Sequence, residues 1–266
     1  MKNLFTYLLL FCCVPWAFGQ AGHIMQGVGS VNMSMGGAAT GQPLDISGTL
    51  QWNPAAITTF NEDTFRFDLG LFFSSPELSS SITDQSGNTF SGTTEDDRGL
   101  SPLPAIAYKL GSETRHHFGF SAFGISGFGV TFPENLSNPI NNPQPNGFGR
   151  VESNYSLFQI GVAYAYELSE KFSVGVQPTF NFGTLDLIPN PTANPNQTGY
   201  PSTDGASTAF GFGAQFGVFF DSGTGFKAGA SYKTCLLYTS PSPRDPRGDL
   251  VCRLLLEKWG GGGGGG

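Results

Sequence analysis

Cysteine is absent from the long middle of this 266-residue chain, because all four cysteines lie before residue 14 or after residue 234. The middle therefore has no disulfide bonds, and its fold depends on backbone hydrogen bonds and packing. Charged residues are also scarce, at 12%, and the 20 acidic residues outnumber the 13 basic ones, which argues against a nucleic-acid partner. No nucleophile-elbow, zinc-protease or phosphate-binding motif occurs, so the sequence predicts no enzyme, no catalytic residue and no cofactor.

The chain also lacks an apolar run long enough to cross a membrane as a helix. The candidate near its start, residues 4–16 after Lys2, falls short of the required length of about 20 residues. We interpret residues 1–19 as a secretory signal peptide that ends in the small-x-small cleavage site Ala17-Phe18-Gly19. A membrane-spanning helix and a lipid anchor on one of the two early cysteines are the weaker alternatives.

The opposite end of the chain, residues 234–266, has the character of a foreign tail. Residues 235–245 and 249–258 each resemble a translated sequencing adapter, and the chain closes with the glycine run 260–266. We predict that this tail is artefactual and disordered, and we exclude it from the reasoning about the fold. A natural linker followed by a short helix is the alternative.

The middle of the chain alternates apolar residues with small or polar ones. In residues 172–182, phenylalanine and valine occupy every second position except that of Pro178. Side chains alternate between the faces of a strand, so such a segment has one apolar side. Proline cannot donate to a strand ladder, so Pro178 predicts a bulge. Seven strands are predicted, at residues 64–74, 98–110, 115–132, 149–168, 170–187, 205–220 and 224–233.

The connections between these strands alternate between long and short. The long ones, residues 75–97, 133–148 and 188–204, are rich in Asn, Pro, Ser and Gly. Outer-membrane barrels have long extracellular loops and short periplasmic turns. The sequence therefore predicts an all-β fold, a transmembrane antiparallel β-barrel in the bacterial outer membrane. A soluble β-sandwich is the alternative, but its strands usually have only about 5–6 residues.

The phenylalanine-rich faces are predicted to contact lipid and the opposite faces to line the barrel interior. In the third strand, the predicted interior face carries Phe123, Ile125 and Gly127. Apolar residues in that position suit a hydrophobic ligand better than a hydrated ion. A β-bulge at Gly124 that changes the register is an equally weighted alternative. In the first strand, the alternation predicts that Arg66 points into the interior.

The segment before the first strand, residues 20–63, carries a family resemblance. The run Met35-Gly36-Gly37-Ala38 is followed by Asp45 and then by Trp52-Asn53-Pro54-Ala55. This arrangement resembles the start of the FadL/TodX-type outer-membrane family, which transports long-chain fatty acids and hydrocarbons. The resemblance implies a fourteen-stranded barrel with residues 20–63 folded inside it as a hatch. Residues 64–233 would then supply about seven of the strands, so we expect the chain to be a fragment.

The resemblance also implies a function, which is passive transport of hydrophobic compounds such as long-chain fatty acids. The expected partners are these small molecules together with outer-membrane lipid and lipopolysaccharide. A kinked third strand is expected to open a lateral exit, and glycine there weakens the strand ladder. The expected hatch and ligand residues are Gly36, Gly37, Asp45, Trp52, Asn53, Pro54 and Ala55, and those of the lateral exit are Phe123, Gly124, Ile125 and Gly127.

Alternatives to transport stay open at this point. The first is a non-transporting outer-membrane scaffold or secretion-system accessory protein of the same barrel family, and a general diffusion porin is a poorer one. For Glu95-Asp96-Asp97, a solvated loop is favoured over a Ca²⁺ site. For His116-His117, metal binding has little support. The sequence leaves the oligomeric state and the identity of the substrate undetermined.

Overall fold

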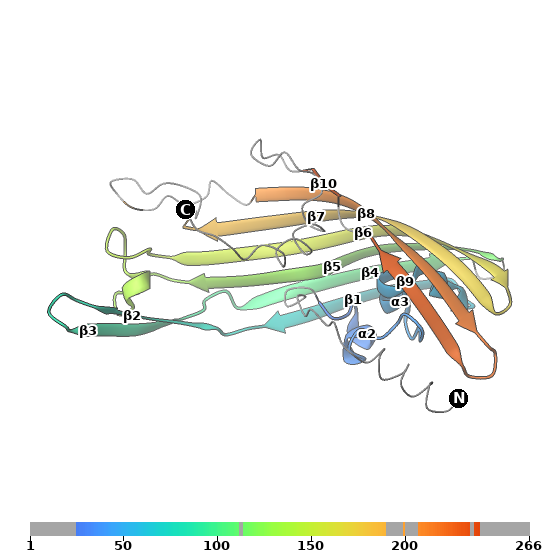
Figure 1. Ribbon diagram of the computed structural model, residues 1–266, viewed down its shortest axis with the longest axis horizontal. Helices are drawn as coiled ribbons and strands as arrows, with labels where there is room; N and C mark the ends of the chain where they lie inside the picture. Colours follow the sequence, from blue (N-terminus) through green and yellow to red (C-terminus); the bar gives the residue numbers. More distant parts are fainter. Residues whose placement is uncertain (1–24, 112–113, 190–198, 200–206, 235–236, 240–266) are drawn as a thin grey trace, which may run out of the picture.

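The computed structural model describes residues 25–111, 114–189, 199, 207–234 and 237–239. These residues form one curled antiparallel sheet, a separate β-hairpin and a short helical segment (Figure 1). The predicted signal peptide and most of the predicted tail lie outside the described residues. Within the described ranges, no helix has the length and apolar character needed for a membrane crossing.

The main sheet contains all seven predicted strands, with bounds close to the expected ones. They are β1 (Thr64–Phe73), β4 (Leu100–Leu110), β5 (His116–Phe132), β6 (Val151–Ser169), β7 (Phe172–Ile188), β8 (Ser207–Asp221) and β9 (Lys227–Lys233). Each strand pairs antiparallel with the next in chain order. A short strand, β10 (Leu237–Thr239), continues from β9 along the same edge of β8. The predicted all-β class and antiparallel order are confirmed.

Two local predictions about the strands are wrong. Residues 75–97 are not only a loop, because they contain the hairpin of β2 (Glu77–Thr83) and β3 (Thr89–Glu95). The hairpin turn is closed by the carboxylate of Asp84, which accepts the backbone N–H groups of Ser86 and Asn88 at 2.8 Å. Pro178 produces no bulge, since the pairing with β8 runs through it without a shift. On the β6 side two residue pairs are skipped and the register is kept, so the missing N–H interrupts the ladder only locally.

The hairpin is held by the loop that follows β5. That loop contains the 3₁₀ turn η2 (Pro139–Asn141), and the fully buried Asn138 precedes it. The amide of Asn138 donates to the carbonyl of Leu78 at 2.7 Å and to the hydroxyl of Thr94 at 2.9 Å. Two loops that the sequence predicts as separate extracellular connections are therefore joined into one structure.

The two faces of the main sheet differ as the alternation predicts. On β6, Phe158, Ile160 and Val162 are 40%, 43% and 56% exposed, whereas the alternate residues Leu157, Gln159, Gly161 and Ala163 are buried. An exposed apolar face on long antiparallel strands is typical of a sheet that contacts lipid. The same face carries exposed Phe65, Phe67 and Leu69 on β1, Phe118 and Phe120 on β5, and Phe210, Phe212, Phe216 and Val218 on β8.

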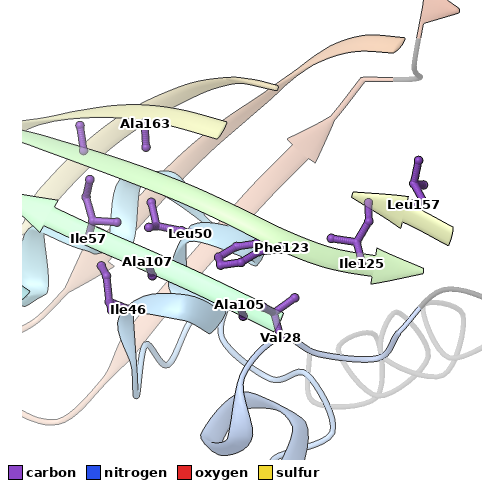
Figure 2. Close-up of a cluster of buried hydrophobic side chains, with 11 residues drawn as sticks. Val28, Ile46, Leu50, Ile57, Ala105, Ala107, Phe123, Ile125, Leu157 and Ala163 are labelled. Carbon is purple, nitrogen blue, oxygen red and sulfur yellow. The ribbon is translucent and has the colours of Figure 1, made fainter. Parts of the chain in front are cut away.

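The N-terminal segment, residues 25–63, packs against the opposite face of the sheet (Figure 1). It contains α2 (Ser30–Ser34), α3 (Ile46–Trp52) and the 3₁₀ helix η1 (Pro54–Thr59). Its apolar side chains Ile46, Leu50 and Ile57 are buried against alanines of β4 and β6 and against Phe123 and Ile125 of β5 (Figure 2). Burial of each such side chain stabilises the fold by about 1.5–3 kcal/mol.

Small residues on the sheet let the helices approach closely. A Cβ atom on Gly119 of β5 would lie 2.6 Å from Cδ2 of Leu50, which is too short for a real contact. Ala107 and Ala163, on the strands that flank β5, are fully buried in the same cluster. The interior face therefore combines small residues where the segment packs with larger residues elsewhere.

Candidate functional site

Asn53 connects the N-terminal segment to the sheet. It ends α3 and begins η1, and its side-chain carbonyl accepts the N–H of Ala55 at 3.1 Å. Its side-chain amide donates to the carbonyl of Thr40 at 2.8 Å and to the carbonyl of Val218 on β8 at 3.0 Å. Asn53 is fully buried, so one side chain joins two parts of the segment to a strand. Pro54 follows at the first position of η1, where its fixed φ is favourable.

Three glycines of the sheet leave room for this turn. Gly175 of β7 lies directly opposite Gly217 of β8, and Gly229 is on β9. A Cβ atom on Gly217 would overlap the side-chain oxygen of Asn53, and one on Gly175 would lie 2.5 Å from the backbone nitrogen of Ala55. The sequence shows these glycines, but only the fold shows that they surround one turn.

The other motif residues shape the N-terminal segment itself. Gly37 has a φ of 83°, and a Cβ atom there would overlap the carbonyl of Gln26. Gly36 has a φ of 65° and open space around it, so only its backbone conformation favours glycine. The indole N–H of Trp52 donates to the side-chain oxygen of Asn32 at 3.1 Å. These residues hold α2 beside α3.

A charged cluster joins the segment to β1. The guanidinium of Arg66 donates to Asp68 from Nε at 2.7 Å and from Nη2 at 3.1 Å. The hydroxyls of Ser30 and Ser47 also donate to Asp68, at 2.9 and 3.1 Å. Asp45 accepts the N–H of Gly48 at the start of α3, and its Oδ2 lies 3.6 Å from Nε of Arg66. The predicted inward orientation of Arg66 is confirmed.

A second attachment lies at the end of the segment, on β4. Lys109 is fully buried, and its ammonium donates to the carbonyls of Phe60 at 2.7 Å and Glu62 at 3.4 Å. Nearby on β5, Nε2 of His117 lies 2.9 Å from a carboxylate oxygen of Glu167. The sequence does not mark Lys109 as a functional residue, because a single lysine at a strand end gives no signal by itself. Within the described residues, no three His, Cys, Asp or Glu side chains gather as they would around a metal ion.

The ladder between β4 and β5 ends partway along the sheet. It runs from Leu110 to Ala105 on β4, whereas the β1–β4 ladder continues through Pro104 to Leu100. Proline has no N–H to offer a second neighbour. At the same level β5 has a bulge, since its register with β6 shifts between Gly124 and Ser126. The alternative of a bulge at Gly124 is therefore confirmed.

The bulge decides which side chains of β5 face the interior. Phe123 and Ile125 are both buried in the core cluster, as predicted. Ser126 now pairs with the buried Leu157, so Gly127 turns to the opposite face. Its predicted interior position is wrong, because the extra residue in the bulge reverses the alternation beyond it.

The separated parts of β4 and β5 form a window in the sheet, which we define as residues 98–104 facing residues 124–130. Beyond the start of β4, the connection from β3 returns to β5, because the N–H of Asp97 donates to the carbonyl of Thr131 at 2.8 Å. A cavity of about 90 Å³ lies in the window and is lined by Leu103 and Pro104, by Gly124 and by Phe158 of the exposed face.

The N-terminal segment reaches this window through Met25. The N–H of Met25 donates to the carbonyl of Ile125, the extra residue of the bulge, at 2.9 Å. A second cavity, of about 60 Å³, lies between the segment and β1. Met25, Leu103, Pro104 and Gly124 line both cavities, so the two meet at Met25. The bulge therefore supplies both the opening and the carbonyl to which the segment binds.

A band of polar side chains, mostly amides, lies on the interior face of the sheet, and we call it the amide belt. It begins two residues along β7 and β8 from the Gly175–Gly217 pair that contacts the Asn53 turn. It consists of Gln159, Gln177, Asn181, Gln215 and Lys233, from β6 to β9. Gln159 donates to Asn181 at 2.9 Å and accepts from the ammonium of Lys233 at 3.2 Å. The side-chain oxygens of Gln177 and Gln215 are buried and have no hydrogen-bond partner among the described residues. The belt thus contains two buried acceptors without a described partner and one cation.

Comparison with known proteins finds a likeness in structure only. No family model and no curated protein matches the chain. The Pseudomonas putida toluene transporter TodX matches with 14% identity and a TM-score of 0.53, over 79% of this chain and 54% of that chain. A Pseudomonas aeruginosa FadL homologue matches with 13% identity and a TM-score of 0.51, over 76% and 50%. The CymD monoaromatic hydrocarbon channel matches with 18% identity and a TM-score of 0.50, over 79% and 53%.

These likenesses identify the fold. The chain has the outer-membrane β-barrel fold of the FadL-type channels, as the motif resemblance predicts, and spans about half the length of the solved structures that it matches. The strands β1 and β4 to β9 correspond to a curled part of such a barrel (Figure 1).

Proposed function

We propose that the protein is an outer-membrane channel for passive entry of hydrophobic compounds, with residues 20–63 acting as its hatch. The observation that carries this proposal is the window between β4 and β5, where a cavity reaches from Met25 of the segment to Phe158 of the exposed face. Such a window would let a hydrophobic molecule leave sideways into lipid. The names of the similar structures, a toluene transporter and a monoaromatic hydrocarbon channel, support this class of solute.

In this proposal the hatch is fixed at one end and moves at the other. Lys109 ties the carbonyls of Phe60 and Glu62 to β4 next to the chain connection into β1. At the opposite end, the N–H of Met25 attaches the hatch to the bulge of β5 through one hydrogen bond to the carbonyl of Ile125. Displacement of Met25 would break this hydrogen bond and join the two cavities that meet there.

The amide belt favours long-chain fatty acids within this class. A hydrocarbon has no polar group to satisfy the buried oxygens of Gln177 and Gln215 or the ammonium of Lys233. A carboxylic acid head group offers a negative charge to Lys233 when ionised and a donor to a glutamine oxygen when protonated. We therefore propose the belt as the head-group end of the path and the window as its exit. The exposed phenylalanine face would contact outer-membrane lipid and lipopolysaccharide.

Closing the window with a disulfide tests the proposal. A Cβ atom on Gly124 would lie 3.7 Å from the backbone oxygen of Pro104, which brings the two backbones into the range of a disulfide. We would therefore replace both residues with cysteine in the full-length protein. The region from residue 20 to 233 has no other cysteine. Uptake of labelled oleate should be lost in the oxidised variant and restored by a reductant.

The matched control places the disulfide in the outer hairpin, at Ser79 and Thr93, whose hydroxyls are 2.8 Å apart across the two strands. Oxidation of this control should leave uptake unchanged. Equal uptake by the oxidised and reduced window variants would contradict a lateral exit at β4 and β5. An absence of oleate uptake in every variant, including the wild type, would favour the alternative of a non-transporting scaffold.

A further inference from the structure

The N-terminal segment contains a buried carboxylate whose charge is poorly balanced. Asp45 is 4% exposed, and its Oδ1 atom has no hydrogen-bond partner among the described residues. Its Oδ2 atom accepts the N–H of Gly48 at a long 3.4 Å and lies 3.6 Å from Nε of Arg66, and the N–H of Ser47 adds a weaker interaction with the carboxylate. A buried carboxylate normally has several close donors, because removing its charge from water is costly. Asp45 has fewer close donors than its burial requires.

The nearest cation is already committed to another carboxylate. Arg66 makes two hydrogen bonds to Asp68, at 2.7 and 3.1 Å, and a third to the hydroxyl of Ser30 at 3.1 Å. Asp68 also opposes the charge of Asp45, since both are negative. β1 therefore gives Asp45 one shared cation and one competing anion.

The other elements packed against α3 do not compensate. On β4, the ammonium of Lys109 is held by backbone carbonyls at the end of the segment, and on β5 His117 pairs with Glu167. The remaining titratable groups of these two strands are Tyr108, which is exposed, and His116, which bonds to Tyr164. Helices α2 and η1 carry no titratable side chain. Arg66 and Asp68 are thus the charges that act on Asp45.

We propose that Asp45 is a proton-sensitive element of the hatch: it favours closure when protonated and loosens the N-terminal segment when ionised. This inference rests on the proposed function of residues 20–63 as a hatch. In the closed arrangement α3 holds Asp45 away from water, and displacement of the segment would return its carboxylate to water. Proton uptake and closure are therefore linked.

The direction of the effect follows from the environment of Asp45. Burial raises the pKa of Asp45 above its ordinary value of 3.8, and the negative charge of Asp68 adds to this shift. The N–H groups of Gly48 and Ser47 and the charge of Arg66 oppose the shift only partly. A group whose pKa is raised in the closed state binds its proton more tightly there. The contribution of Asp45 to closure is therefore present at low pH and is lost as the pH rises through the raised pKa. For one proton, the opening equilibrium changes by at most about tenfold per pH unit.

Hydrogen exchange of the α3 amides tests this inference in the purified full-length protein. Protection of residues 46–52, corrected for the intrinsic pH dependence of exchange, would be compared at pH ~7 and pH ~4.5, a range that lies above the ordinary pKa of an aspartate. In the wild type, protection should rise severalfold on acidification. In Asp45→Asn, which keeps the shape and has no charge, protection should be high at both pH values. Asp84→Asn, in the turn of the outer hairpin, should behave like the wild type.

A fall in wild-type protection on acidification would overturn the inference, because ionised Asp45 would then stabilise closure through Arg66. The same pH response in wild type and Asp45→Asn would also overturn it, since another group would be responsible. The exchange measurement can be interpreted whether or not the wild-type protein transports oleate. A protein that fails to take up oleate but shows the expected exchange would contradict the proposed function and leave the proton linkage standing.

Discussion

At the residue scale, single buried polar side chains determine how the N-terminal segment meets the sheet. The sequence motif drew attention to Asn53, Pro54 and Asp45, and the structure places all three at contacts of this segment. Lys109 makes a comparable contact, yet no pattern in the sequence marks it, because its two acceptors are backbone carbonyls. Backbone partners leave no trace in the identity of residues, so such contacts are visible only after folding.

Replacement of Asn53 is the simplest test of whether one buried polar side chain fixes the N-terminal segment to the sheet. Asn53→Ala removes the hydrogen bonds to Thr40, Ala55 and Val218, and each buried group left without a partner costs about 1–3 kcal/mol. The variant should insert into the membrane normally, because the strand ladders are unchanged, but it should lose uptake of labelled oleate. Its N-terminal segment should also exchange amide hydrogens faster.

Asn88→Ala serves as the control, because the hydrogen bonds of Asn88 to other described residues all lie within the turn of the outer hairpin. Normal oleate uptake by Asn53→Ala would contradict a hatch that depends on this turn. Failure of Asn53→Ala to insert would show instead that the contact is needed for assembly of the barrel.

At the element scale, the strands were predictable and the window was not. Alternation of apolar and polar residues is a local property, so it located all seven strands of the main sheet. The hairpin of β2 and β3 was missed because its face away from Asn138 consists of serines and threonines with a glutamate at one end of each strand, and such residues resemble those of a loop. The window needs Pro104 on one strand and a bulge on another to fall at the same level. Register between strands is a long-range property that one sequence does not show.

Removal of the bulge tests whether these two features make the window. Deletion of Ile125 combined with Pro104→Val would restore both the register of β5 and the missing donor of β4. We expect the β4–β5 ladder to lengthen, amides near residue 104 to become protected from exchange, and oleate uptake to fall at least tenfold. Pro178→Val is the control, since Pro178 interrupts a ladder elsewhere without a change of register. Lengthening of the ladder with unchanged uptake would contradict the role of the window.

At the scale of the whole molecule, the described strands form an open part of a barrel. Among the described residues β1 pairs only with β4, and the far edge is formed by β9 and β10. Unpaired backbone groups in lipid cost several kcal/mol each, so further strands are needed at both edges in a membrane. The solved structures that match are about twice as long as the matched part. The motif in residues 35–55 indicated this fold because it belongs to the segment that packs against the interior face of the sheet.

The central claim is that a hydrophobic acid passes from the amide belt to the window. The most direct measurement is photolabelling of the full-length protein by a long-chain fatty acid that carries a diazirine near its methyl end, followed by mapping of the labelled residues. We expect label on the window, at Leu103, Pro104 or Phe128, and loss of that label when the window is closed by the disulfide. Label confined to the exposed phenylalanines of β6 and β8, with none in the window, would contradict the claim.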